Sequence, residues 1–283
     1  MEEHELLKYA LEHGMINVSY VQEQMEMNER RELLDPTISE VFDEWNDRRL
    51  PICGDFLCLW EDFYMRYMRY CTANDVMKEF LIYGAELTEM GFPILPPAQM
   101  TPSGTIDFRS GLNRSFKGHH NTSCNFYIDD EKFNCAYSTP DKYLNYLKLF
   151  QCVLGLDFSI DTQMPLVMQY WNKYRSMALD WYLTLQGITV IPSVNIIPYK
   201  GREWLLDGLP KRSTVCCSTN GRVRSKGARE EFCEGFYEMC ERLEPTRVVV
   251  VGILPDELDS PVEIINFKSR GQKVNDRFGN GGR

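Results

Sequence analysis

Short apolar runs alternate with longer amphipathic stretches between residues 122 and 267 of the chain. Until the last pair, the middle of each run lies about 25–35 residues after the middle of the previous one, the length of a strand, a helix and their loops. This repeat predicts an α/β domain with parallel strands. The expected strands are Ser123–Ile128, Cys152–Phe158, Ile188–Val194, Thr214–Ser218, Arg247–Ile253 and Val262–Phe267.

Helices are predicted between these runs. Apolar residues recur at helical spacing from Val167 to Leu185, and Gly187 then provides a C-terminal stop. A second apolar stripe extends from Phe232 to Leu243, and Pro140–Phe150 supplies a shorter helix. We therefore expect an irregular or incomplete (β/α) barrel, with an open doubly wound parallel sheet as the alternative.

The two ends of the chain differ from this central domain. Residues 1–90 show helical spacing with many aromatic side chains, which predicts an N-terminal helical region packed against the barrel. Residues 91–121 begin with a proline-rich stretch that cannot be helical and continue with polar residues, so we expect a linker and a surface loop. Residues 268–283 are basic and are predicted to form a flexible tail.

Composition and charge exclude several classes of protein. The chain is 43% hydrophobic with a net charge of −10, which disfavours indiscriminate coating of nucleic acid. Its apolar stretches are far shorter than the about 18 residues of a membrane span, and its acidic start lacks the features of a secretion signal. We expect a cytoplasmic protein without a membrane partner. The absence of any Cys-x-x-Cys pair disfavours a structural zinc site.

Candidate catalytic residues follow the predicted strands at their carboxyl ends, which meet at one rim in a parallel barrel or sheet. Such carboxylates beside an amide could bind Mg²⁺ or divide general-acid and general-base roles. Asp157 is the strongest candidate, because it interrupts an apolar strand where an unpaired charge would be costly. Asp161 could instead cap the next helix, and Asp129 could be a turn residue. The candidates are Asp129, Asp157, Asp161 and Asn195.

A candidate phosphate-binding loop joins the fourth strand to the next helix. Residues 200–229 carry eight lysines and arginines against two acids, and the loop combines these with small residues. Backbone amides at a helix N-terminus beside guanidinium groups suit phosphate, although the order of residues is not that of a P-loop. A solvated cationic surface is the alternative. The predicted binding residues are Ser218, Thr219, Arg222, Arg224 and Lys226.

Several phrases of the sequence resemble a bacterial and phage family catalogued as domain of unknown function 4417. The resemblance covers about residues 92–270 and implies an α/β domain in a mobile-element setting, without an established reaction. Residues 6–34 are similar to the helical leader of some mobile-element tyrosine integrases, but the integrase catalytic residues do not follow. The phrases are FYIDDEKFN (126–134), GLDFSIDTQMP (155–165), YWNKYRSMALDWYLTLQGITVIPSVN (170–195), DGLPKRSTVCCSTNG (207–221) and GFYEMCERLEPTRVVVVG (235–252).

Two functional hypotheses follow. The first is a phage or mobile-element enzyme that acts on a nucleotide or a nucleic-acid phosphate at the rim, with Mg²⁺ as a candidate cofactor. The alternative is a non-catalytic binding protein that targets or assists a host factor, such as a host-defence inhibitor or a replication accessory protein. Its partner would be a host protein or one encoded by the same element.

Overall fold

The computed structural model describes residues 77–113 and 115–279, and for residues 277–279 the backbone alone. The integrase-like leader lies outside the described residues, as does the predicted helical region up to residue 76. The chain divides into two units, Met1–Gly84 and Ala85–Arg283. Only the short 3₁₀ helix η1 (Glu79–Ile82) belongs to the described part of the first unit, and every strand discussed below belongs to the second.

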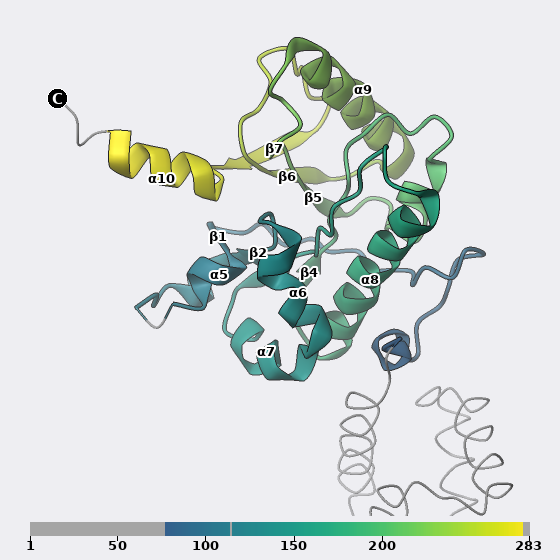
Figure 1. The fold of residues 1–283 in the computed structure, drawn as a ribbon, viewed down its shortest axis with the longest axis vertical. Helices are drawn as coiled ribbons and strands as arrows, with labels where there is room; N and C mark the ends of the chain where they lie inside the picture. The colour runs from purple at the N-terminus through teal and green to yellow at the C-terminus, as the bar shows by residue number, and fades with distance from the viewer. Residues whose placement is uncertain (1–76, 114, 280–283) are drawn as a thin grey trace, which may run out of the picture. The chain divides into compact units, whose positions relative to one another are not determined.

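The second unit is an α/β domain whose described strands are all parallel (Figure 1). Its two sheets are joined by a parallel bridge between Ser193 and Cys216, where the Val194 N–H donates to the Cys216 carbonyl at 2.8 Å. The strands therefore stand side by side in chain order, whereas a doubly wound sheet reverses its order. The four-stranded sheet contains β1 (Thr105–Asp107), β2 (Ser123–Asn125), β3 (Cys152–Leu154) and β4 (Val190–Ile191), and the three-stranded sheet contains β5 (Thr214–Ser218), β6 (Arg247–Val251) and β7 (Glu263–Phe267).

The joined sheet is curved. In a flat sheet with strands about 4.8 Å apart, β1 and β7 would be separated by about 29 Å. Lys273 follows the end of β7 at Phe267 by only a few residues, yet it reaches the Thr105 carbonyl of β1. The strands therefore form an open, incomplete barrel, and the described residues contain no ladder between β7 and β1. One buried cluster includes Leu154, Ile191, Cys216, Val249 and, at its margin, Phe267.

Helix α10 (Arg270–Gly279) bridges from β7 back to β1. The Lys273 Nζ donates to the Thr105 carbonyl at 2.7 Å, and the Arg270 guanidinium lies 3.7 Å from the Asp107 carboxylate. This helix occupies the region predicted to be a flexible tail. Similarly, the predicted surface loop before residue 122 contains β1 and the short helix α5 (Phe108–Gly111).

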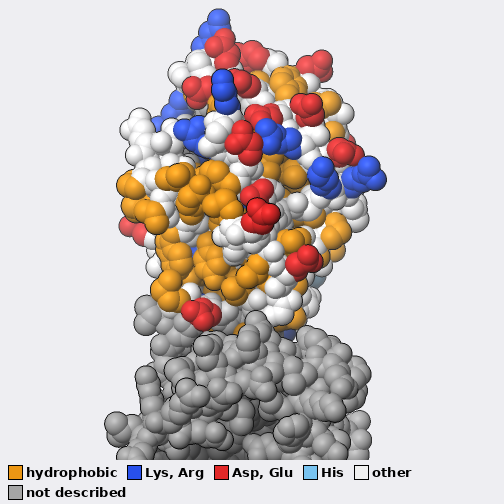
Figure 2. All heavy atoms as spheres, turned by 90° about the vertical axis from the view of Figure 1, so that its right-hand side faces the viewer, with side chains coloured by type: hydrophobic (Ala, Val, Ile, Leu, Met, Phe, Trp, Pro, Cys, Tyr) orange, Lys and Arg blue, Asp and Glu red, His pale blue; other side chains and the backbone are white. Residues whose placement is uncertain are grey.

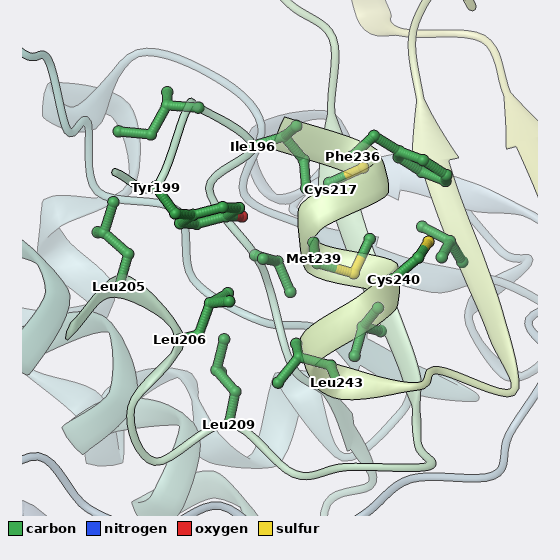
Figure 3. Packing of buried hydrophobic residues seen from close by; sticks show 14 of the residues in the cluster. Ile196, Tyr199, Leu205, Leu206, Leu209, Cys217, Phe236, Met239, Cys240 and Leu243 are labelled. Atoms are coloured by element: carbon green, nitrogen blue, oxygen red, sulfur yellow. The ribbon is translucent and has the colours of Figure 1, made fainter. Parts of the chain in front are cut away.

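The predicted long helices α8 (Leu166–Leu185) and α9 (Lys226–Leu243) are present, and α6 (Asp130–Ser138) and α7 (Pro140–Leu147) lie between β2 and β3. Two further 3₁₀ helices are η2 (His119–Asn121) and η3 (Glu203–Leu206). Figure 3 shows how α9 turns Phe236, Met239 and Leu243 toward a core shared with Cys217 of β5. None of the helices in the described part of the chain combines the length and apolarity needed to cross a bilayer.

Close contact between α9 and the β4–β5 connection requires glycine at position 235. A Cβ atom there would lie 2.6 Å from the Ile197 carbonyl oxygen and 2.8 Å from its carbon. We expect Gly235→Ala to lower the free energy of unfolding by about 1–3 kcal/mol through overpacking, although alanine is the better helix former. Urea denaturation would measure this change.

Gly227→Ala on the same helix is the matched control, because a Cβ atom at residue 227 would have nothing within 4 Å. It should raise the free energy of unfolding by about 0.5 kcal/mol. Equal effects of the two substitutions would contradict the close contact between α9 and Ile197.

Candidate functional site

The carboxyl ends of β3 and β4 bring two of the predicted site residues into contact. Asp157 and Asn195 follow these neighbouring strands, and the Asn195 Nδ2 donates to the Asp157 Oδ1 at 2.6 Å. Both residues are half-buried. Their pairing follows from the parallel register, in which Leu154 stands opposite Ile191 and the two chain segments leave the sheet together. We call the region around this pair the rim.

The surroundings of Asp157 raise the pKa of its carboxyl group. Burial raises the pKa of the Asp157 carboxyl from 3.8 to about 6, and the nearby Asp130 adds to the rise. The positive charge of Arg222 and the hydrogen bond from Asn195 both act in the opposite direction, lowering the pKa. Desolvation therefore outweighs the two stabilising partners. A carboxyl that titrates near neutral pH is suited to general acid–base chemistry.

Arg222 reaches the rim from the predicted phosphate-binding loop. Its Nη2 donates to the Ile160 carbonyl at 3.2 Å, so the β5–α9 loop lies against the β3–α8 loop. The side chain is half-buried, and its charge acts on Asp157. Ser225 then caps α9, because its hydroxyl accepts from the Ala228 N–H at 3.2 Å. The loop therefore brings one cation and a helix N-terminus to this end of the barrel.

Tyr127, Ser193 and Asn220 link three of the loops that surround the rim. The hydroxyl groups of Tyr127 and Ser193 are 3.0 Å apart, which links the loop after β2 to the loop after β4. The Asn220 Nδ2 donates to the Tyr127 carbonyl at 3.2 Å, which adds the loop after β5. Tyr127 is not among the predicted site residues, because a tyrosine within an apolar run is indistinguishable in sequence from a core residue.

Asp130 flanks the rim on the side of α6. Its carboxylate accepts from the Ser159 N–H at 3.2 Å and from the Ser159 hydroxyl at 2.9 Å. The Arg175 guanidinium lies 3.7 Å from this carboxylate and 3.4 Å from the centre of the Phe158 ring. Through Asp130 and Arg175, helices α6 and α8 hold the segment around Asp157 in place.

Two predicted acids make local contacts instead. Asp161 is exposed, and its carboxylate accepts from the Gln163 N–H at 2.7 Å, the pattern of an Asx turn. Asp129 is also exposed, precedes α6 and forms an ion pair with Lys132. Neither has a hydrogen bond or ion pair with Asp157 or Asn195 among the described residues. Asp129 lies at a turn, whereas Asp161 forms a turn ahead of α8 and does not cap that helix, whose N-cap residue is Pro165.

The remaining predicted binding residues differ in accessibility. The Ser218 hydroxyl donates to the Val251 carbonyl at 3.1 Å, and Thr219 is buried beside Gly252. Lys226 and Arg224 are exposed, and Lys226 lies 3.7 Å from Glu230 on the next turn of α9. Of the three predicted cations, Arg222 therefore stands nearest to the acid–amide pair.

Comparison with known proteins agrees with the predicted resemblance. A family model described as Domain of unknown function (DUF4417) matches residues 86–268. The Gene 1 protein of Mycobacterium phage L5 is 32% identical over 171 residues, which cover 60% of this chain and 75% of the phage protein. The Gene 1 protein of Mycobacterium phage D29 is 28% identical over 171 residues, 60% of this chain and 63% of that protein.

No solved structure matches the chain significantly. The relationship to known proteins therefore rests on sequence, and the family match covers most of the α/β domain, including the rim residues Asp157, Asn195 and Arg222. The chain belongs to the family described as Domain of unknown function (DUF4417).

Proposed function

We propose that the rim binds a phosphate group of a nucleotide or nucleic acid and catalyses a reaction on that ligand. Asp157 is the proposed general acid or base, and Asn195 holds its carboxyl in one orientation. Arg222 is the proposed phosphate ligand, with Arg224 and Lys226 beside it. The observation that carries this proposal is the Asp157–Asn195 hydrogen bond of 2.6 Å beside a half-buried guanidinium group.

Magnesium would fit this proposal as a metal shared with the ligand. The described residues contain no group of three or more His, Cys, Asp or Glu side chains arranged around a metal. Mg²⁺ commonly takes one or two carboxylates, several waters and phosphate oxygens of the substrate. Waters and phosphate oxygens would supply most of its ligands here, and the cation would neutralise charge on the phosphate.

The setting of the proposed activity is a phage or another mobile element. Two relatives of the chain are phage proteins whose name, Gene 1 protein, states no activity. A nucleotide or nucleic-acid ligand is compatible with such a setting.

Loss of the Arg222 guanidinium should weaken phosphate binding. Charge-assisted hydrogen bonds contribute about 1.5–3 kcal/mol, so we expect Arg222→Ala to reduce the affinity for a stabilising nucleotide by about 10–100-fold. Thermal-shift titration with nucleoside mono-, di- and triphosphates, with and without Mg²⁺, would identify that nucleotide and measure the loss.

Arg242→Ala is the matched control, because it removes the same charge from the last turn of α9, where Arg242 pairs with Glu238. Its nucleotide affinity should equal that of the unmodified protein. If the two arginine variants bind equally well, the rim is not a phosphate site. An affinity that falls steeply with salt for DNA of any sequence would indicate a nucleic-acid ligand.

A non-catalytic role in binding another protein has its own supporting observation. Figure 2 shows hydrophobic side chains gathered into a patch on one face of the molecule. In addition, the start of α8 exposes three consecutive apolar side chains, Leu166 (51%), Val167 (72%) and Met168 (49%). Exposed apolar groups of this kind mark protein interfaces. Recovery of a host protein that Val167→Asp releases, without any nucleotide response, would favour this second function.

A further inference from the structure

Helix α8 carries a row of buried polar side chains on the face that meets the barrel. Asn172, Ser176 and Asp180 follow one another at intervals of four residues, which places them on one side of the helix. They are 5%, 9% and 2% exposed, respectively. Burying polar groups at three successive turns is costly unless each has a partner.

All three partners are backbone groups of the segment that follows β3. The Asp180 Oδ1 accepts from the Leu156 N–H at 3.0 Å, and the Ser176 hydroxyl oxygen accepts from the Phe158 N–H at 3.3 Å. The Asn172 Nδ2 donates to the Ser159 carbonyl at 2.5 Å. The row therefore holds the peptide groups on both sides of Asp157.

The fit of Asp180 depends on Gly155, the residue directly after β3. A Cβ atom at Gly155 would lie 2.5 Å from the Asp180 Oδ2 and 2.7 Å from the Ser193 backbone nitrogen. Only a residue without a side chain admits the carboxyl of Asp180 at this point. Burial raises the pKa of Asp180 well above 3.8, and the charge of Asp157 raises it further. An apolar side chain would avoid this cost, so the acid has a role other than packing.

We propose that Asn172, Ser176 and Asp180 act as positioning residues that orient Asp157 toward Asn195, with Asp180 as the main one. The N–H groups of Leu156 and Phe158, on either side of Asp157, both donate to side chains of α8. With these groups held, the Asp157 carboxylate accepts from the Asn195 amide of the segment that follows β4. The catalytic meaning of this orientation rests on the proposed function, but the orientation itself can be measured without a substrate.

The test is NMR spectroscopy of the full-length protein. The side-chain amide resonance of Asn195 reports its short hydrogen bond to Asp157, and a carbon-detected titration reports the pKa of Asp157. In Asp180→Ala we expect the Asn195 amide resonance to move toward that of a free amide and the pKa of Asp157 to change by more than about half a unit. Asp180→Asn keeps an acceptor for the Leu156 N–H and should preserve both signals.

Ser176→Ala is the second variant, in case Asp180→Ala does not fold. It removes one small acceptor, and we expect a smaller displacement of the same two signals. Thr184→Ala is the control, since Thr184 lies on the next turn and its hydroxyl donates to the Asp180 carbonyl within the helix. It should leave both signals unchanged.

A lower melting temperature with unchanged Asn195 and Asp157 signals in both Asp180→Ala and Ser176→Ala would overturn the positioning role. Failure of nucleotide binding would instead remove the proposed function and leave these NMR results standing.

Discussion

Asp157→Asn should make the protein more stable at neutral pH by about 2–3 kcal/mol, while abolishing the proposed acid–base activity. Because the folded-state pKa of Asp157 is raised to about 6 from 3.8, the ionised carboxyl destabilises the native state. Below pH 3.8 the carboxyl carries no such penalty. The penalty grows as the pH rises from 3.8 to about 6, because in this range the unfolded state ionises before the folded state does, and it is complete above about 6. Asparagine removes the charge and retains an oxygen that can accept from the Asn195 amide.

Melting curves of the two proteins between pH 4 and pH 8 would measure this effect. The difference in melting temperature should be near zero at pH 4 and reach several degrees at pH 8. For any nucleotide-directed reaction, loss of the acid–base group should cost at least about 100-fold in turnover. Asp161→Asn is the control, since that exposed acid lies in the same loop, and its stability should change by less than about 0.5 kcal/mol.

A marked loss of stability in Asp157→Asn would show that the carboxylate is a structural acceptor. The assignment of Asp157 as an acid–base residue would then fail, whatever the ligand.

Lys173→Met should stabilise the protein strongly at low pH. Lys173 on α8 is 5% exposed, its Nζ donates to the Leu205 carbonyl at 2.8 Å, and it lies 5.1 Å from the centre of the Phe92 ring. Burial lowers the pKa of Lys173 from 10.5 to about 7, although the charge of Asp207 opposes the shift. Below pH 7 the native state therefore has to bury a charged ammonium group.

Methionine fills a similar volume without a charge, so we expect a gain of roughly 3 kcal/mol at pH 6. The advantage should shrink as the pH rises through 7 and vanish near 10.5, where the lysine is neutral in both the folded and unfolded states. The Leu205 carbonyl then loses a partner at a cost of about 1 kcal/mol. Urea denaturation at pH 6, 8 and 10 would show the trend.

Lys142→Met on α7 is the control, since Lys142 is exposed. It should change the free energy of unfolding by less than about 0.5 kcal/mol at each pH. A pH-independent gain in Lys173→Met would contradict a buried, charge-destabilised lysine.

The α/β architecture could be predicted from the spacing of apolar residues. A strand or helix that buries one face repeats its apolar residues at a characteristic interval. Strand β5 and helix α8 match the predicted bounds closely, and α9 ends at the predicted Leu243 but begins at Lys226, ahead of its apolar stripe. Other predicted strands extend beyond the ends of the observed strands. Leu156 and Phe158, for example, are buried beyond the last paired residue of β3, so apolar character there does not indicate a strand.

Elements with short or polar sequences could not be predicted in this way. β1 has three residues, Thr105–Asp107, and it exists because β2 supplies a parallel partner. α10 is rich in charge and has no wide apolar stripe. Its placement depends on contacts of Arg270 and Lys273 with β1, which lies far away in sequence.

The candidate site could be predicted in part. Asp157 and Asn195 follow from the rule that parallel strands end at one rim, whereas the contact of Arg222 with Ile160 depends on the shapes of two loops. The sequence of α8 contains a signal for its row of buried polar residues. The apolar stripe beside that row, however, predicts only a helix that packs in the core. Asn172, Ser176 and Asp180 recur every four residues along the helix, which indicates a polar partner on the facing element.

The link between α10 and β1 has a consequence for the order of folding. Lys273 contacts a carbonyl that was synthesised 168 residues earlier. Strand β1 must therefore wait for α10 to leave the ribosome before its outer edge is covered. Until then that edge is open to other chains.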